Sequence, residues 1–317
     1  MYDSPLRSHK KKYNNLMKPV IISVGNIAMG GTGKTPFTVF LAKRYMSAGE
    51  KVAILSLGYK GKLGYGANII SDGNKIFHSP PYAADEPYMM ASALSGENGA
   101  VVITGKDRLA SYTLATERFA PTVFLLDDGF QHHSLPKDVD IVLLDYAKPF
   151  STGFPFPFGY LREFPSALRR ADIIVFTRAL AATLPEGAEK HCQGKQIFYC
   201  ANKYMAFSAK LPLDYISGKK VWLMSAIAGP VQFGKQIQQL GAVVAGHSVF
   251  KDHHFYTEKE IKKVITCAEN TGSEILMTTQ KDFVKIPEEY KHLFIYPDMS
   301  VQMLNQGLFD AIDNIRR

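Results

Sequence analysis

One stretch, residues 20–42, constrains the fold more than any other, and it reads VIISVGNIAMGGTGKTPFTVFLA. An apolar, β-branched run is followed by a glycine-dense turn, and an apolar-periodic helix is predicted to begin near Lys34. A strand, a glycine loop and Gly-Lys-Thr at a helix start are the layout of a phosphate-binding P-loop. In that layout Lys34 reaches the β- and γ-phosphates and the Thr35 hydroxyl binds Mg²⁺. The sequence therefore predicts a nucleotide phosphate site.

The glycine spacing departs from the usual P-loop pattern at one position. The pattern G-x-x-x-x-G-K-[ST] places a glycine at position 28, where this chain has Ala28. We expect glycines at neighbouring positions to supply the flexibility instead. A glycine-rich turn without a ligand is the alternative, and it is disfavoured because Gly-Lys-Thr follows a clear strand and precedes a clear helix. The predicted phosphate cradle comprises Gly30, Gly31, Thr32, Gly33, Lys34 and Thr35.

Composition limits the classes of protein that this chain can form. It has 317 residues, 46% hydrophobic and 21% charged, enough for one large or two modest packed domains. The net charge of +8 favours anionic partners such as nucleotides or an anionic membrane surface. No nucleic-acid-binding module is recognisable, so no nucleic-acid partner is expected. Three cysteines without metal-like spacing are typical of reduced thiols in a cytosolic protein.

Two observations concern membranes. No secretory signal and no run of membrane-spanning length is present, so we expect a protein that is soluble or at most peripheral. Residues 1–18 are polar and basic, which is consistent either with a solvated tail or with a segment lying on anionic lipid headgroups.

Strand and helix patterns alternate along the chain and predict an α/β fold. We expect a P-loop NTPase-like parallel-sheet domain over residues 1–210, including the basic N-terminal tail 1–18. A second, smaller α/β domain is expected over residues 211–317, with a strand at 292–296 and a closing helix. In the first domain, short strands are expected at 196–200 and 204–208.

Acidic residues follow the predicted strand 122–126. The strand runs directly into Asp127-Asp128-Gly129, which is the Walker B layout for holding Mg²⁺. Ligands bind at the carboxyl ends of strands in open α/β sheets, so these acids and the P-loop are expected to face one crevice. The alternative is an acidic turn opener before Gly129.

Three further segments have two interpretations each. Asp85 precedes a predicted helix, where capping is its default role. Residues 150–160, FSTGFPFPFGY, form an aromatic irregular loop that either contacts an apolar ligand or packs on its own aromatics. The segment around His253 is either a polar loop before a helix N-capped by Thr257, or it presents a histidine across the domain cleft.

Seven strings together resemble the tetraacyldisaccharide 4′-kinase family of lipid A biosynthesis: GNIAMGGTGKTP, ADEP, GKDR, DDGFQH, FGYLRE, DHH and TTQKD. Their order and spacing match over about residues 19–284. Two features depart from this family's usual pattern. Its members usually begin with an apolar N-terminal segment, whereas a short basic tail precedes Pro19. Either the start is truncated, or membrane contact depends on basic and aromatic surface residues. The family usually has an arginine before Gly-Tyr in the loop after the second strand, whereas this chain has Leu57 before Gly58-Tyr59.

The resemblance implies a reaction and roles for particular residues. The family transfers the γ-phosphate of ATP to the 4′-hydroxyl of a tetraacyldisaccharide 1-phosphate lipid A precursor, with ATP and Mg²⁺ bound. By motif, Asp85 is the base on the sugar hydroxyl, oriented by His253, and Arg108 neutralises charge on the transferring group. The metal and γ-phosphate region comprises Asp127, Asp128 and Gln131, and Glu163 is a weaker substrate-site candidate.

The resemblance also implies partners and a location. We expect the lipid A disaccharide precursor and an anionic inner-membrane surface as partners, and a monomer peripheral to the cytoplasmic face of the bacterial inner membrane. A P-loop ATPase or GTPase acting as a regulatory switch is the alternative. The guanine-reading motif of GTPases is absent: Thr279-Gln280-Lys281-Asp282 has similar letters in the wrong order.

Overall fold

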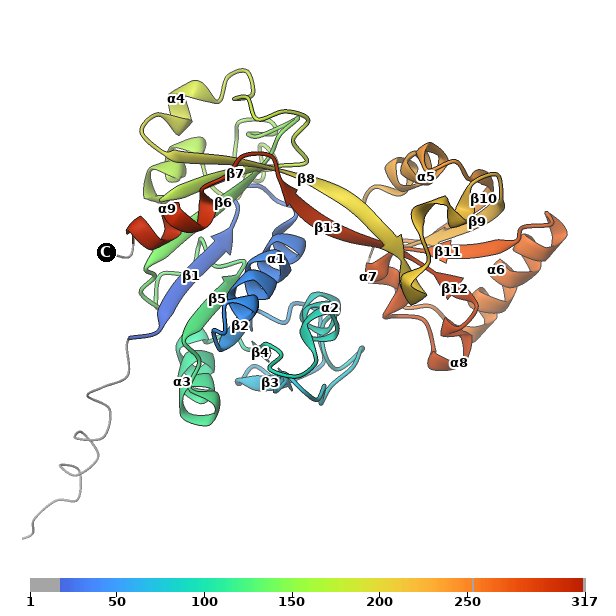
Figure 1. The fold of residues 1–317 in the computed structure, drawn as a ribbon, viewed down its shortest axis with the longest axis horizontal. Helices are drawn as coiled ribbons and strands as arrows, with labels where there is room; N and C mark the ends of the chain where they lie inside the picture. The colour runs from blue at the N-terminus through green and yellow to red at the C-terminus, as the bar shows by residue number, and fades with distance from the viewer. Residues whose placement is uncertain (1–17, 253, 316–317) are drawn as a thin grey trace, which may run out of the picture.

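The computed structural model describes residues 18–252 and 254–315, which form two lobes, each around its own β-sheet (Figure 1). The larger sheet has nine strands in the order β13-β8-β7-β6-β1-β5-β2-β4-β3. The pairs β3–β4 and β8–β13 are antiparallel, and the other neighbours are parallel. The strands are β1 (Val20–Gly25), β2 (Val52–Ser56), β3 (Asn68–Ser71), β4 (Val101–Thr104), β5 (Val123–Asp127), β6 (Val139–Asp145), β7 (Ile173–Thr177), β8 (Gln196–Phe207) and β13 (Pro297–Met303).

Helices alternate with these strands, as the α/β prediction requires. They are α1 (Lys34–Ser47), α2 (Asp85–Leu94), α3 (Arg108–Phe119), α4 (Glu189–Cys192) and α9 (Leu308–Ile315). The strand–turn–helix prediction for residues 20–42 is confirmed, since β1 leads through a turn into α1 at Lys34.

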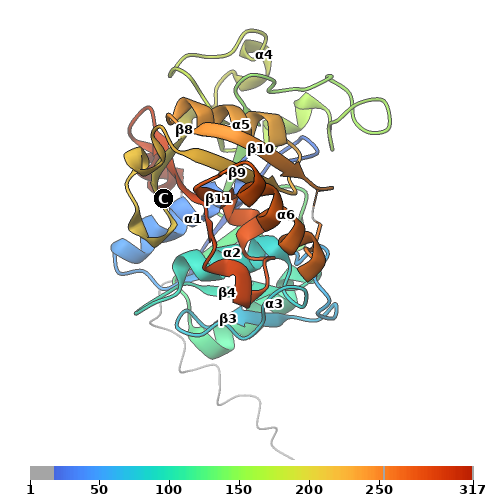
Figure 2. The same cartoon turned by 90° about the vertical axis from the view of Figure 1, so that its right-hand side faces the viewer.

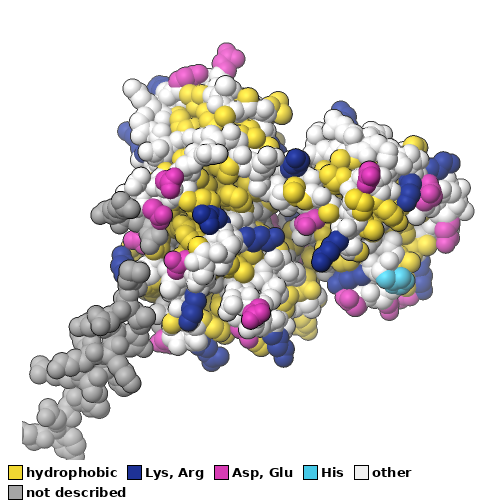
Figure 3. All heavy atoms as spheres, viewed as in Figure 1, with side chains coloured by type: hydrophobic (Ala, Val, Ile, Leu, Met, Phe, Trp, Pro, Cys, Tyr) yellow, Lys and Arg dark blue, Asp and Glu magenta, His cyan; other side chains and the backbone are white. Residues whose placement is uncertain are grey.

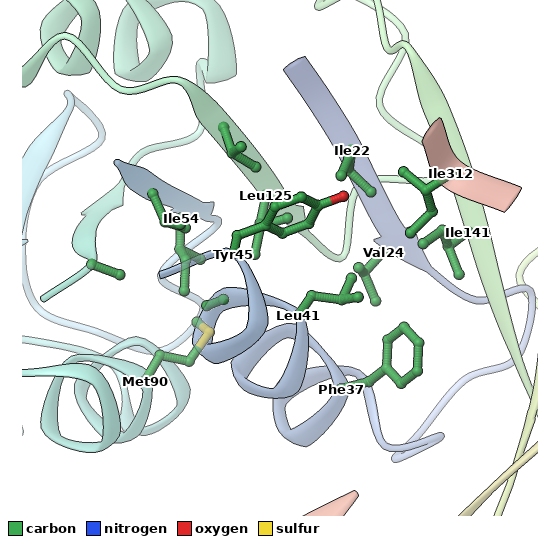
Figure 4. Packing of buried hydrophobic residues seen from close by; sticks show 14 of the residues in the cluster. Ile22, Val24, Phe37, Leu41, Tyr45, Ile54, Met90, Leu125, Ile141 and Ile312 are labelled. Carbon is green, nitrogen blue, oxygen red and sulfur yellow. The ribbon is translucent and has the colours of Figure 1, made fainter. Parts of the chain in front are cut away.

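The core of the large lobe lies between α1 and the centre of the sheet. All six residues of β1 are buried between β5 and β6, as expected for a central parallel strand that is covered on both faces. Figure 4 shows Phe37 and Leu41 of α1 packed toward Val24 of β1. Met90 of α2 and Ile312 of α9 belong to the same cluster, so helices far apart in the sequence pack beside α1.

The smaller lobe contains a four-stranded, all-parallel sheet in the order β10-β9-β11-β12. Its strands are β9 (Lys220–Ser225), β10 (Val243–Val249), β11 (Ile275–Thr278) and β12 (Phe294–Ile295). Its helices are α5 (Pro230–Gln239), α6 (Glu258–Asn270), α7 (Gln280–Phe283) and α8 (Glu288–Lys291). Thr257 caps α6 in a capping box with Glu260, which confirms the N-cap prediction.

The end of the chain departs from the predicted grouping. The sequence placed everything after residue 211 in the second unit, but β13 pairs with β8 of the large sheet and α9 packs on its core. The reason is apolar burial, because Leu308, Ala311 and Ile312 face the cluster around α1. The two short strands expected at 196–200 and 204–208 are one continuous β8, which pairs with β7 over residues 196–200 and with β13 over residues 200–207. Figure 1 shows this β8–β13 ribbon running from one lobe to the other.

Residues 161–164, which follow the irregular stretch 150–160, are not helical. A short 3₁₀ helix runs over Pro165–Arg170. Arg162 N–H instead donates to the Ile27 carbonyl, and Phe164 is extended, as a residue before proline prefers.

Within residues 18–252 and 254–315, no helix has the length and apolar character needed to cross a bilayer. On the face drawn in Figure 3, Lys and Arg side chains lie on both lobes beside their junction, interspersed with Asp and Glu.

Candidate active site

Most of the predicted site residues lie at the carboxyl-end edge of the large sheet. The P-loop follows β1, Asp128 follows β5, and Arg108 begins α3 shortly after β4. This edge is where open parallel sheets bind ligands, because their connecting loops and helix N-termini meet there. Of the two acids predicted to face one crevice with the P-loop, Asp128 lies 3.5 Å from Lys34 Nζ, whereas Asp127, the last residue of β5, is buried.

The P-loop leads into α1 through Gly33, which has φ +87°. Gly30 has φ +100°, also a left-handed conformation that side-chain-bearing residues rarely adopt. No side chain of the described residues caps the start of α1. The N–H groups of its first turn therefore remain available for an anion, and the helix dipole favours negative charge there.

The first half of the P-loop is held by a neighbouring segment rather than by a glycine turn. Ala28 forms an antiparallel bridge with Leu161, and the Met29 N–H donates to the Tyr160 carbonyl at 2.7 Å. Bridged backbone is extended, a conformation open to any residue. This explains why position 28 needs no glycine.

Three side chains fasten the second half of the P-loop, and sequence reasoning missed all three. Asn26 Nδ2 donates to Thr32 Oγ1 at 2.9 Å, and Thr177 Oγ1 donates to the Thr32 carbonyl at 2.9 Å. Arg178 donates to the Gly31 carbonyl at 2.7 Å. Asn26 follows β1 and Thr177 ends β7, so position at the carboxyl end of a parallel strand is the signal that could have found them.

Asp127 and Asp128 occupy different environments although they are adjacent. Asp127 is buried and accepts from Ser56 Oγ at 3.1 Å and Thr38 Oγ1 at 3.4 Å. Burial raises the pKa of Asp127 to about 6, with further contributions from Glu86 and Asp128 that outweigh the opposing Lys34 and Arg108. Asp127 is therefore an inward-facing acid that organises the end of the sheet.

Asp128 instead faces the P-loop lysine. It has φ +57°, and its carboxylate lies 3.5 Å from Lys34 Nζ. Arg162 Nη1 donates to both oxygens of Asp128, at 2.8 and 2.9 Å. Arg162 was part of the FGYLRE string but was given no role from the sequence.

Arg108 is almost completely buried beneath these acids. Its guanidinium donates to the Gly105 carbonyl at 3.0 Å and to the Asp127 carbonyl at 3.1 Å. Burial lowers the pKa of Arg108, and the nearby Asp127 and Asp128 carboxylates oppose that shift. The positive charge is thus held in a fixed position behind the acids.

Gln131 and Glu163 form a second cluster beside Asp128. Gln131 Nε2 donates to Glu163 Oε1 and to the Asn26 carbonyl, both at 2.9 Å. Arg170 Nη2 donates to both oxygens of Glu163, at 2.9 and 2.8 Å. Burial tends to raise the pKa of Glu163, but the hydrogen bonds from Gln131 and Arg170 outweigh it and lower that pKa. This cluster borders a cavity of about 430 Å³ that Arg162, Phe164 and Arg169 also line.

Asp85 is the first residue of α2 and is buried. The N-cap interpretation of Asp85 is wrong, because Ala84 occupies the cap position without a side-chain hydrogen bond. Glu86, the next residue, contributes to the raised pKa of Asp127, so the first turn of α2 lies near the end of β5. His253 lies outside the described residues.

The oxygen-rich edge fits a magnesium ion better than a metal with a dedicated protein cage. Within the described ranges, no group of three or more His, Cys, Asp or Glu side chains is arranged to hold a metal. Mg²⁺ usually takes one or two carboxylates together with phosphate oxygens and water. Asp128 lies 3.5 Å from Lys34 Nζ and Gln131 donates to the Asn26 carbonyl, so both bring side-chain oxygen atoms near the P-loop, whose own Thr35 supplies a hydroxyl.

Comparison with known proteins agrees with this geometry. A family model described as tetraacyldisaccharide-1-P 4′-kinase matches residues 5–316. The tetraacyldisaccharide 4′-kinase of Geobacter metallireducens is 38% identical over 277 residues, which is 87% of this chain and 80% of that protein. The corresponding protein of Halothermothrix orenii is 36% identical over 319 residues, or 92% and 82% of the two chains.

A solved structure is also similar. The “apo” form of LpxK from Aquifex aeolicus, crystallised in complex with ATP, superposes with a TM-score of 0.75 at 30% identity. The superposition covers 95% of this chain and 90% of that chain. The P-loop NTPase-like α/β fold predicted from the sequence is confirmed by this likeness and by the topology of the large sheet.

Proposed function

This chain belongs to the tetraacyldisaccharide-1-P 4′-kinase family, and on that premise we propose that it transfers the γ-phosphate of ATP to the 4′-hydroxyl of a tetraacyldisaccharide 1-phosphate, a lipid A precursor. The observation that carries the proposal for this site is the approach of Lys34 Nζ to Asp128 at 3.5 Å. It joins the P-loop to the acids after β5, as a phosphotransfer site requires.

The donor half of the site is the P-loop. The N–H groups of residues 30–35 and the Lys34 ammonium bind the β- and γ-phosphates of ATP. Mg²⁺ would be held by Thr35, Asp128 and Gln131, with Asp127 behind them, and when bound it neutralises charge on the phosphates. Arg108 adds a fixed positive charge on the same side.

The acceptor half uses the start of α2. As the 4′-oxygen forms its bond to the γ-phosphorus, its proton passes to Asp85 and the bond from that phosphorus to the β-bridging oxygen breaks, releasing ADP. His253 orients Asp85 in this proposal. Glu163, held by Gln131 and Arg170, supports the substrate side. Most of the acceleration comes from positioning and charge neutralisation.

Location and assembly belong to the same proposal. We propose that the chain acts as a monomer, peripheral to the cytoplasmic face of the inner membrane, where its acylated substrate resides. The domain division at 210/211 is likewise a proposal, with β13 and α9 returning to the first domain.

The test is transfer of radiolabel from γ-labelled ATP to micelle-dispersed tetraacyldisaccharide 1-phosphate. We expect labelled lipid from the parent protein, and strongly reduced labelling in Asp85→Ala and in His253→Ala. A regulatory ATPase or GTPase would instead release labelled phosphate without labelling lipid. Full activity in both variants would remove the assignment of the base while leaving the reaction in place.

A further inference from the structure

Five exposed aromatic side chains gather on residues 154–164, which we name the aromatic loop. Single exposed apolar residues are common on protein surfaces, but five aromatics within eleven residues form a patch that indicates an interaction site. Their exposed fractions are 58% for Phe154, 72% for Phe156, 87% for Phe158, 66% for Tyr160 and 55% for Phe164. The chain between β6 and β7, light green in Figure 2, extends outward from the large-sheet lobe.

Backbone hydrogen bonds within the aromatic loop fix its conformation. Phe156 N–H donates to the Leu161 carbonyl at 2.9 Å, and Leu161 N–H donates to the Phe154 carbonyl at 3.1 Å. A side chain at Gly159 would lie only 2.2 Å from the Phe154 carbonyl oxygen, which shows how tightly the loop closes. Leu161 is fully buried and anchors the loop, while the aromatic rings on either side of it face outward.

Cations surround the aromatic loop. Residues 146–180 contain five Lys or Arg and two Asp or Glu, a net charge of +3. All five are exposed, and three of them are paired with carboxylates: Arg162 with Asp128, Arg170 with Glu163 and Arg178 with Asp145. Lys148 and Arg169 are the two that have no carboxylate partner among the described residues. Aromatic rings at the tip and basic side chains around them match a membrane interface, where rings enter the headgroup region and cations meet anionic lipid.

The same loop is fastened to the phosphate site. Tyr160 and Leu161 pair with Met29 and Ala28 of the P-loop, and Arg162 binds Asp128. Any surface that fixes the aromatic loop therefore also fixes the distance of the P-loop from that surface. Met29, whose N–H donates to the Tyr160 carbonyl, is 50% exposed and adds an apolar side chain beside the loop.

We propose that the aromatic loop inserts Phe156 and Phe158 into the interface of an anionic lipid bilayer and so sets the height of the P-loop above the lipid headgroups. The proposal rests on the proposed lipid-kinase function, because it assumes that the acceptor hydroxyl is presented at a membrane surface. It names the surface that makes the contact, which the peripheral location alone does not specify.

Vesicle sedimentation tests the proposal with the full chain and no substrate lipid. The vesicles contain either phosphatidylcholine alone or phosphatidylcholine with about one-third phosphatidylglycerol. We expect the parent protein to prefer the anionic vesicles, and Phe156→Ser/Phe158→Ser to bind them about tenfold less tightly or worse. Phe77→Ser is the matched control, because Phe77 is 46% exposed and its N–H donates to the carbonyl of Ile70 in β3, the edge strand on the other side of β1 from β6 and β7.

Each contrary outcome is separable from failure of the kinase function when transfer to micelle-dispersed lipid is measured in parallel. Equal vesicle binding by parent and double variant overturns the proposal. Absence of vesicle binding by a parent protein that phosphorylates micellar lipid also overturns it and leaves the kinase intact. A double variant that keeps vesicle binding but loses turnover on micellar lipid assigns the loop to the acyl chains of the substrate instead.

Insertion depth gives a second readout that loss of folding cannot imitate. Phe158→Trp places a reporter at the most exposed ring of the loop. We expect its fluorescence to be quenched by lipids brominated near the headgroup. The parent protein's one tryptophan, Trp222 in β9 of the smaller lobe, provides the unquenched baseline. Quenching no greater than that of Trp222 contradicts insertion.

Discussion

Arg162 donates from one guanidinium nitrogen, Nη1, to both oxygens of Asp128, whose carboxylate also lies 3.5 Å from Lys34 Nζ. Asp128 is therefore shared between the P-loop lysine and the aromatic loop, to which Arg162 belongs. Sharing weakens the hold of Asp128 on Lys34, which leaves that ammonium available to phosphate. It also fixes the direction of the carboxylate, as a metal ligand requires.

Removing Arg162 tests this arrangement. We expect Arg162→Ala to lower turnover about 10- to 100-fold, the equivalent of one charge-assisted hydrogen bond. Because a single nitrogen makes the contact, Arg162→Lys can replace it with an ammonium, and we expect most of the activity to return. The measurement is kcat for lipid phosphorylation in micelles, with Arg118→Ala on the exposed end of α3 as the control. Equal losses in the Lys and Ala variants would contradict a point contact.

The parts of this site that are formed by residues close together in the sequence were predictable. The P-loop and the acids after β5 are contiguous patterns, in which strand, turn chemistry and helix start lie within a few residues. Arg162 lies 34 residues from Asp128, and Thr177 lies 145 residues from Thr32. Such contacts depend on which strands become neighbours, and strand order leaves no local signal.

The fold shows the same division. Alternating strand and helix patterns predicted two α/β units, because apolar periodicity reports local structure directly. The return of β13 to β8 was not predictable from that pattern. β13 follows directly after β12, the last strand of the smaller sheet, and its own sequence does not indicate that it belongs to the larger sheet. Its position is decided by the apolar contacts that Leu308 and Ile312 of α9 make in the core of the large lobe.

Thr177 offers a test of how the P-loop is held. Thr177→Val keeps the shape but removes the donor to the Thr32 carbonyl. We expect KM for ATP to rise about 5- to 10-fold, since one neutral hydrogen bond contributes about 1 kcal/mol, with KM for the lipid little changed. Thr177→Ser should restore the affinity.

A matched control exists in the other sheet. Thr278 at the end of β11 is also buried and donates to the Met224 carbonyl at 2.8 Å. We expect Thr278→Val to reduce the free energy of unfolding by a similar amount without raising KM for ATP. If KM for ATP rose in both Thr177→Val and Thr278→Val, loss of stability rather than loss of the P-loop contact would be the cause of the weaker ATP affinity.

The raised pKa of Asp127 predicts a pH-dependent stability. Below pH 4 the carboxyl is protonated in both the folded and unfolded states, so it does not make the free energy of unfolding depend on pH. Between pH 4 and pH 6 the folded state retains a proton that the unfolded state releases, so stability falls as pH rises. Above pH 6 the ionised Asp127 lowers the free energy of unfolding by its full amount, about 3 kcal/mol for a pKa raised by about two units.

Asp127→Asn removes that ionisation. We expect the variant to be more stable than the parent at pH 7.5 and similar to it near pH 4, as measured by urea denaturation without nucleotide or Mg²⁺. Glu117→Gln, at an exposed position on α3, should show no such difference between the two pH values. An Asp127→Asn effect of equal size at both pH values would mean that lost hydrogen bonds, not the charge, decide the outcome.

The small lobe contains a buried ion pair between Lys285 and Asp282. Lys285 Nζ lies 2.6 Å from Asp282 Oδ1, and both side chains are fully buried. Asp282 Oδ2 also accepts from the Ala226 N–H and from the Thr279 hydroxyl. Desolvation offsets much of the attraction in such a pair, so its net contribution is small, whereas removing one partner leaves an uncompensated charge.

Lys285→Met should therefore reduce the free energy of unfolding by about 3–5 kcal/mol. Adding Asp282→Asn should recover most of that loss, because the amide oxygen still accepts from Ala226 and carries no charge. Urea denaturation of both single variants and the double variant gives the coupling directly. A double variant no more stable than Lys285→Met would mean that the packing of the lysine chain, rather than its charge, holds this part of the lobe together.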